Sequence, residues 1–281
     1  MAVTITNDQI MSLRNQTGAG IMDCKAALKE SNGDMQKAIE ILRKKGLSGL
    51  AKRSGRTMKE GIVVLKNNDS KYVMVELNCE TDFVAKNDEF VKLANEIANE
   101  MLAKDFDPSK DEKAKEKLNS IAIKIGENMQ IRRGVTYKKE SNSIIGYYLH
   151  ADNKKASLIK VSFSNKPIDV SKAEELAKNL AMQCVAMGAK WVKKEDVPKE
   201  VIEKEKEIYK EGSKTQGKSE IALNKMLEGR INKFYQEMCL MEQVYIRDTK
   251  ITIKKYIENV SNETQTTLTV ERFETFIVGV E

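Results

Sequence analysis

The side chains that could perform acid–base, nucleophilic or metal chemistry are few in this 281-residue sequence. His150 is the only histidine, and the four cysteines (Cys24, Cys79, Cys184 and Cys239) contain no C-x-x-C pair. Nucleophilic sites of the Ser-His-Asp and Cys-His types need that one histidine beside a specific partner, and zinc sites need clustered ligands. Neither a P-loop nor a G-x-G-x-x-G turn is present. We therefore expect no metal, no cofactor and no disulfide framework, and an enzyme is the weaker hypothesis.

A different chemistry, that of a protein contact, is offered by NCETDFVAKN at residues 78–87. Thr81 and Asp82 are residue types that begin helices, whereas Phe83 and Val84 are apolar residues at a connection that should lie on the surface. An aromatic ring there either covers its own helix or contacts another molecule. Asp82 either caps the following helix or contacts the same partner. The spacing alone leaves both alternatives open.

The elements around this segment predict a strand before it and a helix after it. Alternating apolar residues predict a strand at 71–79, and a three- and four-residue period predicts a helix that reaches about residue 103. That helix has one apolar stripe, formed by Phe90, Leu93, Ala94, Ile97, Ala98 and Met101. With strands at 61–66 and 130–137, and a helix through Ile121 and Ile125, residues 61–140 predict a three-stranded antiparallel unit with helices on one face.

The same plan recurs in the next part of the chain. Residues 146–150 align with 61–65, and 157–163 align with 72–78 at a separation of 85, while the helices align at a separation of 83. The turn that carries Asp82-Phe83 in the first copy therefore corresponds to residues 165–169, NKPID, in the second. We expect the exposed apolar turn in one copy only, which favours a dedicated use.

The remaining segments complete an α+β fold with several parts. Residues 1–46 predict three short helices, capped at Asn7 or Asp8 and at Asp34, that end at Gly46 and form a small core. A basic, glycine-containing linker follows at 47–60. The second core unit spans 141–281, ends with a helix at 251–257 and a strand at 269–280, and is interrupted at about 198–238 by an antiparallel helix pair whose turn lies at 212–217.

Composition predicts a soluble, cytoplasmic protein. The 48 basic and 42 acidic residues are mixed along the chain and leave a net charge of +6, which gives only weak attraction to nucleic acid. No signal sequence precedes the first helix, and no stretch approaches the length of a membrane span. An alternative hypothesis is a nucleic-acid- or ribosome-binding protein, because the pI is about 8.9 and the linker is basic. Against it, aromatic residues are 6% and do not interleave with basic ones.

Four separated stretches give the chain a resemblance to a known family. They are LRNQTGAGIMDCKAAL at 13–28, NCETDFVAKN at 78–87, IGENMQIRR at 125–133 and MLEGRINKFYQE at 226–237. Together, in this order, they resemble the bacterial translation elongation factor Ts family over essentially the whole chain. The resemblance implies a ubiquitin-associated-like helical module at 1–46, two repeated core subdomains at 61–140 and 141–281, and a coiled coil at about 198–238. It also implies a guanine nucleotide exchange factor for elongation factor Tu.

The resemblance also implies a set of partner-binding residues. Asp82 and Phe83, with Thr81 and Val84 beside them, would enter the GTPase, where the phenylalanine wedges near the magnesium and nucleotide site. Other contacts carry over onto these positions: Arg14, Ile21, Met22, Lys25 and His150. From the residues alone, Ile21 and Met22 could instead be core, Lys25 solvated, and His150 a surface residue or, in a third hypothesis, the acid–base group of an enzyme.

Two features of the assembly stay open in the sequence. Some members of the family carry a further C-terminal helix that touches the GTPase; this chain stops at Gly279-Val280-Glu281, so we expect that contact to be missing. The coiled coil and the repeated sheets could each self-associate, so a homodimer and a 2:2 complex with the GTPase are both compatible with the sequence.

Overall fold

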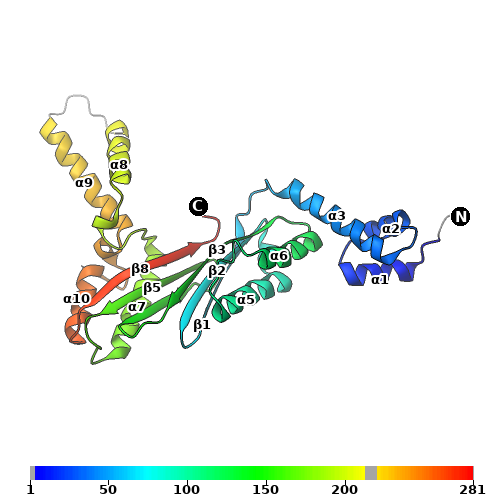
Figure 1. The fold of residues 1–281 in the computed structure, drawn as a ribbon. Helices are drawn as coiled ribbons and strands as arrows, with labels where there is room; N and C mark the ends of the chain where they lie inside the picture. The colour runs from blue at the N-terminus through cyan, green and yellow to red at the C-terminus, as the bar shows by residue number, and fades with distance from the viewer. Residues whose placement is uncertain (1–3, 213–219, 281) are drawn as a thin grey trace. The chain divides into compact units, whose positions relative to one another are not determined.

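The computed structural model describes residues 4–212 and 220–280 (Figure 1). The chain divides into two compact units. Unit 1 comprises residues 1–66, 75–135 and 278–281, and unit 2 comprises residues 67–74 and 136–277. Helices and small sheets alternate in both units, so the predicted α+β class is confirmed. Most of the predicted turn at 212–217 lies outside the described residues.

Unit 1 begins with three helices, α1 (Asn7–Thr17), α2 (Ile21–Glu30) and α3 (Met35–Arg53). Asp34 caps α3 as predicted, accepting a hydrogen bond from the Lys37 N–H at 3.1 Å. The predicted cap of α1 is wrong: Thr6 caps it and forms a capping box with Gln9. The helices enclose a small core formed by Ile10, Leu13, Cys24, Ala27, Leu28, Ala38 and Leu42.

Helix α3 does not end at Gly46, which corrects the prediction of a helix stop there. It continues to Arg53, so the first half of the predicted linker is helical. The glycine has a packing reason instead, because a Cβ atom at position 46 would lie 2.7 Å from Cγ2 of Ile123. Gly46 therefore permits the close approach of α3 and the helix that carries Ile123.

The rest of unit 1 contains most of a three-stranded sheet in the order β1-β2-β3, of which residues 67–74 and 136–138 are assigned to unit 2. Its elements are β1 (Glu60–Asn67), β2 (Lys71–Cys79), α4 (Asp82–Ala85), α5 (Asp88–Ala103), α6 (Glu112–Ile125) and β3 (Met129–Lys138). Helices α5 and α6 lie beside the sheet (Figure 1). The six apolar residues that predicted the stripe of α5 are all buried. Helix α6 begins earlier than expected, because Asp111 caps it by accepting from the Ala114 N–H at 2.9 Å.

Unit 2 repeats the strand–strand–helix order. Its elements are β4 (Ser143–Leu149), β5 (Lys155–Phe163), α7 (Val170–Met187), α10 (Ile253–Glu263) and β8 (Leu268–Ile277). Strand β5 pairs antiparallel with β4 on one side and β8 on the other. Helix α7 packs closely on β4, since a Cβ atom at Gly146 would lie 2.2 Å from the backbone of Ala177. Apolar side chains of β5, β8, α7 and α10 form the buried core of this unit.

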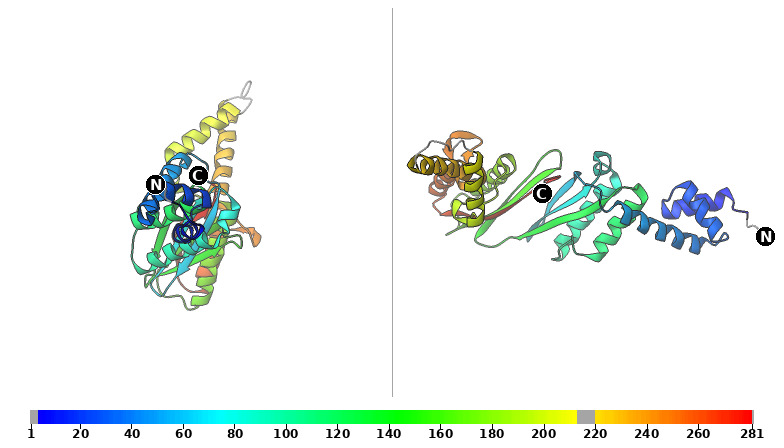
Figure 2. Two further views of the ribbon diagram at one scale, coloured as in Figure 1. Left: turned by 90° about the vertical axis from the view of Figure 1, so that its right-hand side faces the viewer. Right: turned by 90° about the horizontal axis from the view of Figure 1, so that it is seen from above.

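Two further helices, α8 (Lys199–Gly212) and α9 (Glu220–Met238), lie side by side and run in opposite directions (Figures 1 and 2). Short connecting elements flank them: the 3-10 turns η1 (Lys194–Asp196) and η2 (Leu240–Glu242), and the pair β6 (Val244–Tyr245) and β7 (Asp248–Thr252). Buried Val197, Phe234 and Cys239 close the base of the helix pair. In the part of the chain that the structure describes, no helix has both the length and the apolar composition of a membrane span.

Candidate partner-binding surface

Phe83 is the most exposed aromatic or aliphatic side chain of the segment at 78–87. It sits on the four-residue helix α4 with 82% of its surface exposed, whereas its neighbours Val84 and Ala85 are only 5% and 4% exposed. The alternative that the ring covers its own helix is therefore wrong. The apolar residues beside it anchor α4 to the unit, and the ring itself is left to solvent.

Different residues cap the helix that carries Phe83, α4, and the helix that follows it, α5. Thr81 caps α4, with its hydroxyl oxygen accepting from the Val84 N–H at 3.4 Å. Asn87, rather than Asp82, caps α5 by accepting from two N–H groups. Asp82 instead forms an ion pair with Lys86 at 2.8 Å across one helical turn, and its side chain keeps 45% of its surface exposed. Asp82 thus presents a carboxylate beside the exposed ring.

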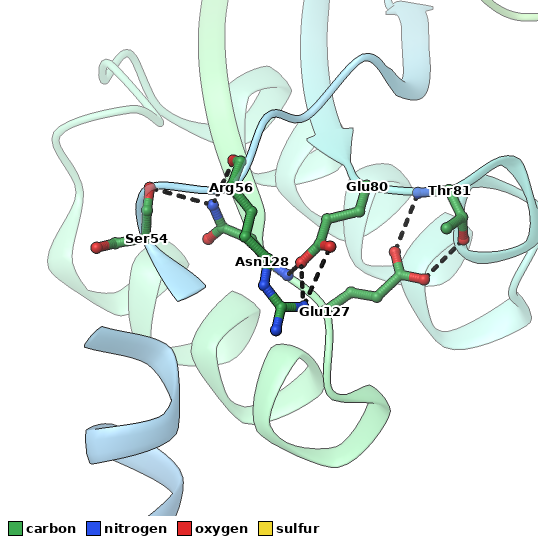
Figure 3. Close-up of polar contacts among 6 residues, drawn as sticks. All are labelled: Ser54, Arg56, Glu80, Thr81, Glu127 and Asn128. Carbon is green, nitrogen blue, oxygen red and sulfur yellow. Dashed lines mark hydrogen bonds and ion pairs between the residues drawn. The ribbon is translucent and has the colours of Figure 1, made fainter. Parts of the chain in front are cut away.

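Two carboxylates connect this turn to the segment that follows α6 (Figure 3). Glu127 accepts from the Thr81 N–H at 3.1 Å and from the Thr81 hydroxyl at 2.7 Å. Glu80 accepts from the Asn128 N–H at 2.6 Å and pairs with the Arg56 guanidinium at 3.3 Å. The turn before Phe83 is consequently held by charge-assisted hydrogen bonds, which are among the stronger ones in proteins.

The residues expected to form the N-terminal contact all lie on the surface of the helical module. Arg14 is exposed on α1, and Lys25 is exposed on α2. Ile21 and Met22, at the start of α2, have 47% and 75% of their surfaces exposed. The alternative that they fill the module core is therefore wrong, and other residues of α2 fill it instead: Cys24, Ala27 and Leu28.

His150 lies in unit 2, in the turn after β4. Its Nδ1 atom is 3.0 Å from Oδ1 of Asp152, and its ring meets Tyr148 edge-on. Burial opposes ionisation of Asp152, but the hydrogen bond from the Lys154 N–H and the nearby His150 ring prevail and lower the pKa of the carboxyl group. The histidine is thus tied into its own turn, with 45% of its side chain exposed.

The corresponding turn of the second copy also presents an apolar residue, contrary to the sequence prediction. Ile168 has 66% of its surface exposed. Its backbone N–H donates to the Thr264 carbonyl at 3.1 Å, and Asn165 exchanges hydrogen bonds with Thr266. An aliphatic residue, however, replaces the aromatic ring, and the fully described stretch between β5 and α7 contains no short helix. Both copies therefore expose an apolar side chain at this turn, phenylalanine in the first and isoleucine in the second.

Other kinds of site find little support among the described residues. Within residues 4–212 and 220–280, no group of three or more His, Cys, Asp or Glu residues is arranged to hold a metal ion. All four cysteines are buried thiols. Burial raises the pKa of Cys184, and burial together with nearby carboxylates raises the pKa of Cys239 to about 11. These two thiols are therefore protonated and poor nucleophiles at neutral pH.

Sequence reasoning missed the residues that hold the turn in place. Glu80 and Glu127 belong to two of the stretches that carried the family resemblance, but they lie 46 to 48 residues from the groups they bind. Periodicity reports on neighbours one or two turns apart and cannot pair such positions. The only available signal was that both carboxylates stand at element ends, where backbone N–H groups need acceptors.

Comparisons with known proteins agree with this picture. The family model described as elongation factor TS matches residues 80–280. Elongation factor Ts of Trichlorobacter lovleyi is 38% identical over 291 residues, with 99% of this chain and 93% of the relative covered. Elongation factor Ts of Clostridium botulinum strain Alaska E43 is 38% identical over 288 residues, with 98% and 93% covered. Because these matches span both units, the chain belongs to the elongation factor Ts family.

Proposed function

We propose that this protein is a guanine nucleotide exchange factor for elongation factor Tu and acts in translation elongation in the cytoplasm. The observation that carries the proposal is Phe83, whose ring is 82% exposed on a helix that is otherwise anchored. An aromatic ring left in solvent forgoes the free energy of burial, which it gains when a partner covers it. Aromatic residues are accordingly common anchors of interfaces.

The proposed activity needs no catalytic acid, base or cofactor. An exchange factor acts by binding the nucleotide-free GTPase more tightly than the nucleotide-bound form. Because binding free energies are linked, it weakens the nucleotide by the same factor by which the nucleotide weakens it. The protein is thus not an enzyme in the chemical sense, and the proposed exchange does not depend on His150 as a proton carrier.

In the proposed mechanism, Phe83 and Asp82 enter the GTPase near its magnesium and nucleotide site. Magnesium usually bridges the phosphates and the nucleotide-binding loop of such GTPases. A ring that displaces the residues around the magnesium site would therefore weaken nucleotide binding. A buried aromatic anchor contributes about 2 kcal/mol or more. That free energy corresponds to a coupling factor of roughly thirty.

The other partner-binding residues expected from the sequence supply the rest of the proposed contact. We assign Arg14, Ile21, Met22 and Lys25 to a first contact by the helical module, and His150 to a separate one by the second core subdomain. The parts we propose are the ubiquitin-associated-like module at 1–46, a connection at 47–60 whose first half is the end of α3, the core subdomains at 61–140 and 141–281, and the coiled coil at about 198–238. Size measurements of the purified complex decide between a 1:1 and a 2:2 assembly.

The test is stopped-flow release of a fluorescent GDP from elongation factor Tu. The unaltered protein should accelerate release, and Phe83→Ala should lower the rate at saturating factor by roughly thirtyfold, as expected for an anchor of about 2 kcal/mol. Because the ring is exposed, the same substitution should change the free energy of unfolding by less than about 0.5 kcal/mol.

Ile168→Ala is the matched control, since it truncates an exposed apolar residue at the corresponding turn of the second copy. It should leave the accelerated release rate within about twofold, because surface truncations outside an interface centre have small effects. Release by Phe83→Ala as fast as with the unaltered protein would refute the wedge. Failure of the unaltered protein to accelerate release would refute the exchange function itself.

A further inference from the structure

Two pairs of adjacent residues, Glu80-Thr81 and Glu127-Asn128, are joined by reciprocal hydrogen bonds from backbone N–H groups to carboxylates (Figure 3). The Glu80 carboxylate accepts from the N–H of Asn128 at 2.6 Å. The Glu127 carboxylate accepts from the N–H of Thr81 at 3.1 Å. Each pair therefore supplies one carboxylate to the other pair's backbone. We call this four-residue arrangement the clasp.

The clasp lies directly before the helix that carries Phe83. Glu127 also accepts from the hydroxyl of Thr81 at 2.7 Å, while the same hydroxyl oxygen accepts from the Val84 N–H at 3.4 Å. The hydroxyl proton is thereby committed to Glu127, which turns the oxygen lone pairs toward the first turn of α4. Glu127 fixes both the backbone and the side chain of the N-cap.

Helix α4 needs such support because it is short. It spans only Asp82–Ala85, and a helix of this length has no stability of its own in water, since nucleation costs more than one turn of hydrogen bonds returns. Burial of Val84 and Ala85 fixes one side of it. The direction of the exposed ring therefore depends on how firmly the N-cap is held.

The other half of the clasp reaches the end of α3. Besides the Asn128 N–H, Glu80 binds the Arg56 guanidinium at 3.3 Å, and its side chain is only 19% exposed. The Asn128 side-chain amide donates to the carbonyls of Ser54 and Arg56 at 3.3 and 3.2 Å. The chain that leaves the helical module is thus fastened to the same turn that precedes Phe83.

We infer that Glu127 is a positioning residue for nucleotide exchange: through the clasp it orients α4 so that Phe83 meets the GTPase already in its productive direction. This inference rests on the proposed exchange function. It also gives Thr81 a role distinct from contact with the partner, because its hydroxyl and N–H are both occupied within the unit. A pre-oriented anchor pays less ordering cost at the moment of binding.

The chemistry of the clasp suggests substitutions that separate positioning from folding. Glu127→Gln keeps the size of the side chain but removes its charge and leaves one acceptor oxygen for the two Thr81 donors, the N–H and the hydroxyl. Thr81→Val keeps the shape and removes the hydroxyl, whereas Thr81→Ser retains it. Glu112→Gln is the matched control, because Glu112 is on α6 with an exposed side chain and pairs across one turn with Lys115.

The experiment measures the maximal rate of nucleotide release and the factor concentration at half-maximal rate for each variant, together with thermal melting. Glu127→Gln and Thr81→Val should each lower the maximal rate by about tenfold, as expected for loss of a charge-assisted contact that positions a reacting group. Their combination should cost less than the sum of the two single losses, because both variants remove the hydrogen bond between the Thr81 hydroxyl and Glu127. Thr81→Ser should recover most of the rate, and Glu112→Gln should match the unaltered protein.

The outcomes separate this inference from the function beneath it. If the unaltered protein accelerates release but Glu127→Gln reaches the same maximal rate, the clasp has only a structural role and the inference is overturned, whatever the melting temperature. Additive losses in the double variant would also overturn it, because the two residues would then act independently. If the unaltered protein does not accelerate release at all, the exchange function fails first and the positioning role fails with it.

Discussion

At the scale of single residues, Phe83 is exposed because its neighbours on α4 are already buried, hydrogen-bonded or ion-paired. Val84 is buried, Thr81 caps the helix, and Asp82 pairs with Lys86. Val84 and Ala85 already occupy the side of α4 that faces the unit. The Phe83 side chain therefore lies on the opposite, solvent-facing side. The sequence leaves the fate of the ring open, and only the tertiary packing of the turn decides it.

Asp82 provides a prediction at this scale. Its ion pair with Lys86 joins side chains that are 45% and 76% exposed, and exposed pairs contribute at most about 1 kcal/mol. Asp82→Ala should therefore change the melting temperature little but slow GDP release from elongation factor Tu. Lys86→Ala breaks the same pair and serves as the control. If both variants slow release equally, the ion pair and not the Asp82 carboxylate carries the effect.

At the scale of elements, the sheet of unit 1 contains a buried charge that packing alone would not predict. Glu76 on β2 is fully buried and accepts from Arg133 at 2.7 Å and from Arg132 at 3.3 Å, both on β3. Asn78 donates a further hydrogen bond to it at 3.1 Å. A buried carboxylate is tolerated only when it is paired and hydrogen-bonded in this way, so these contacts tie the two strands together.

We predict that Arg133→Met lowers the free energy of unfolding by about 2 kcal/mol, because it removes a charge-assisted hydrogen bond from a buried carboxylate. Urea unfolding measures this directly. Lys110→Met removes an ion pair whose lysine side chain is 84% exposed, and should cost less than about 0.5 kcal/mol. Equal losses in the two variants would mean that Glu76 finds other partners when Arg133 is absent.

The helical module provides the second prediction at this scale. Its core is small, and small cores bury too little surface to be firmly stable, so the module should open more often than the rest of the chain. Cys24 is completely buried in that core, and Cys184 is completely buried in the core of unit 2. In the native protein at pH 8, Cys24 should react with a thiol reagent at least about tenfold faster than Cys184.

Mass spectrometry of the labelled peptides identifies which cysteine reacts, and Cys24→Ser provides the control by removing the fast phase. The raised pKa of Cys184 works in the same direction, since its thiol stays protonated as long as it stays buried. A single rate shared by all four cysteines would show instead that the module opens only when the whole chain unfolds.

Particular elements show which parts of the fold are predictable from the sequence. The three- and four-residue period of α5 and the alternation in β2 are local patterns, so they predict their elements correctly. The early start of α6 is hidden because its first turns are charged and only Ala114 and Leu118 are buried there. The role of Gly46 is hidden because its reason, contact with Ile123, lies 77 positions away in the sequence. The clasp escapes prediction for the same reason.

At the scale of the whole molecule, part of the positive charge is paired with carboxylates inside each unit. Although the net charge is +6, several basic side chains are engaged by carboxylates within each unit. Arg56 of the basic linker pairs with Glu80, and Lys160 in unit 2 pairs with Glu140 and Glu271. Binding to a phosphate backbone depends on releasing counterions from unpaired cations, and internally paired groups contribute less to it.

The decisive quantity for a wedge made by Phe83 is the equilibrium coupling between the protein and the nucleotide. The affinity of elongation factor Tu for GDP is measured with and without saturating factor, using the unaltered protein and Phe83→Ala. We expect the unaltered factor to weaken GDP strongly, and Phe83→Ala to reduce this weakening by roughly thirtyfold while still binding the GTPase through the helical module. An unchanged coupling factor in Phe83→Ala would contradict the wedge.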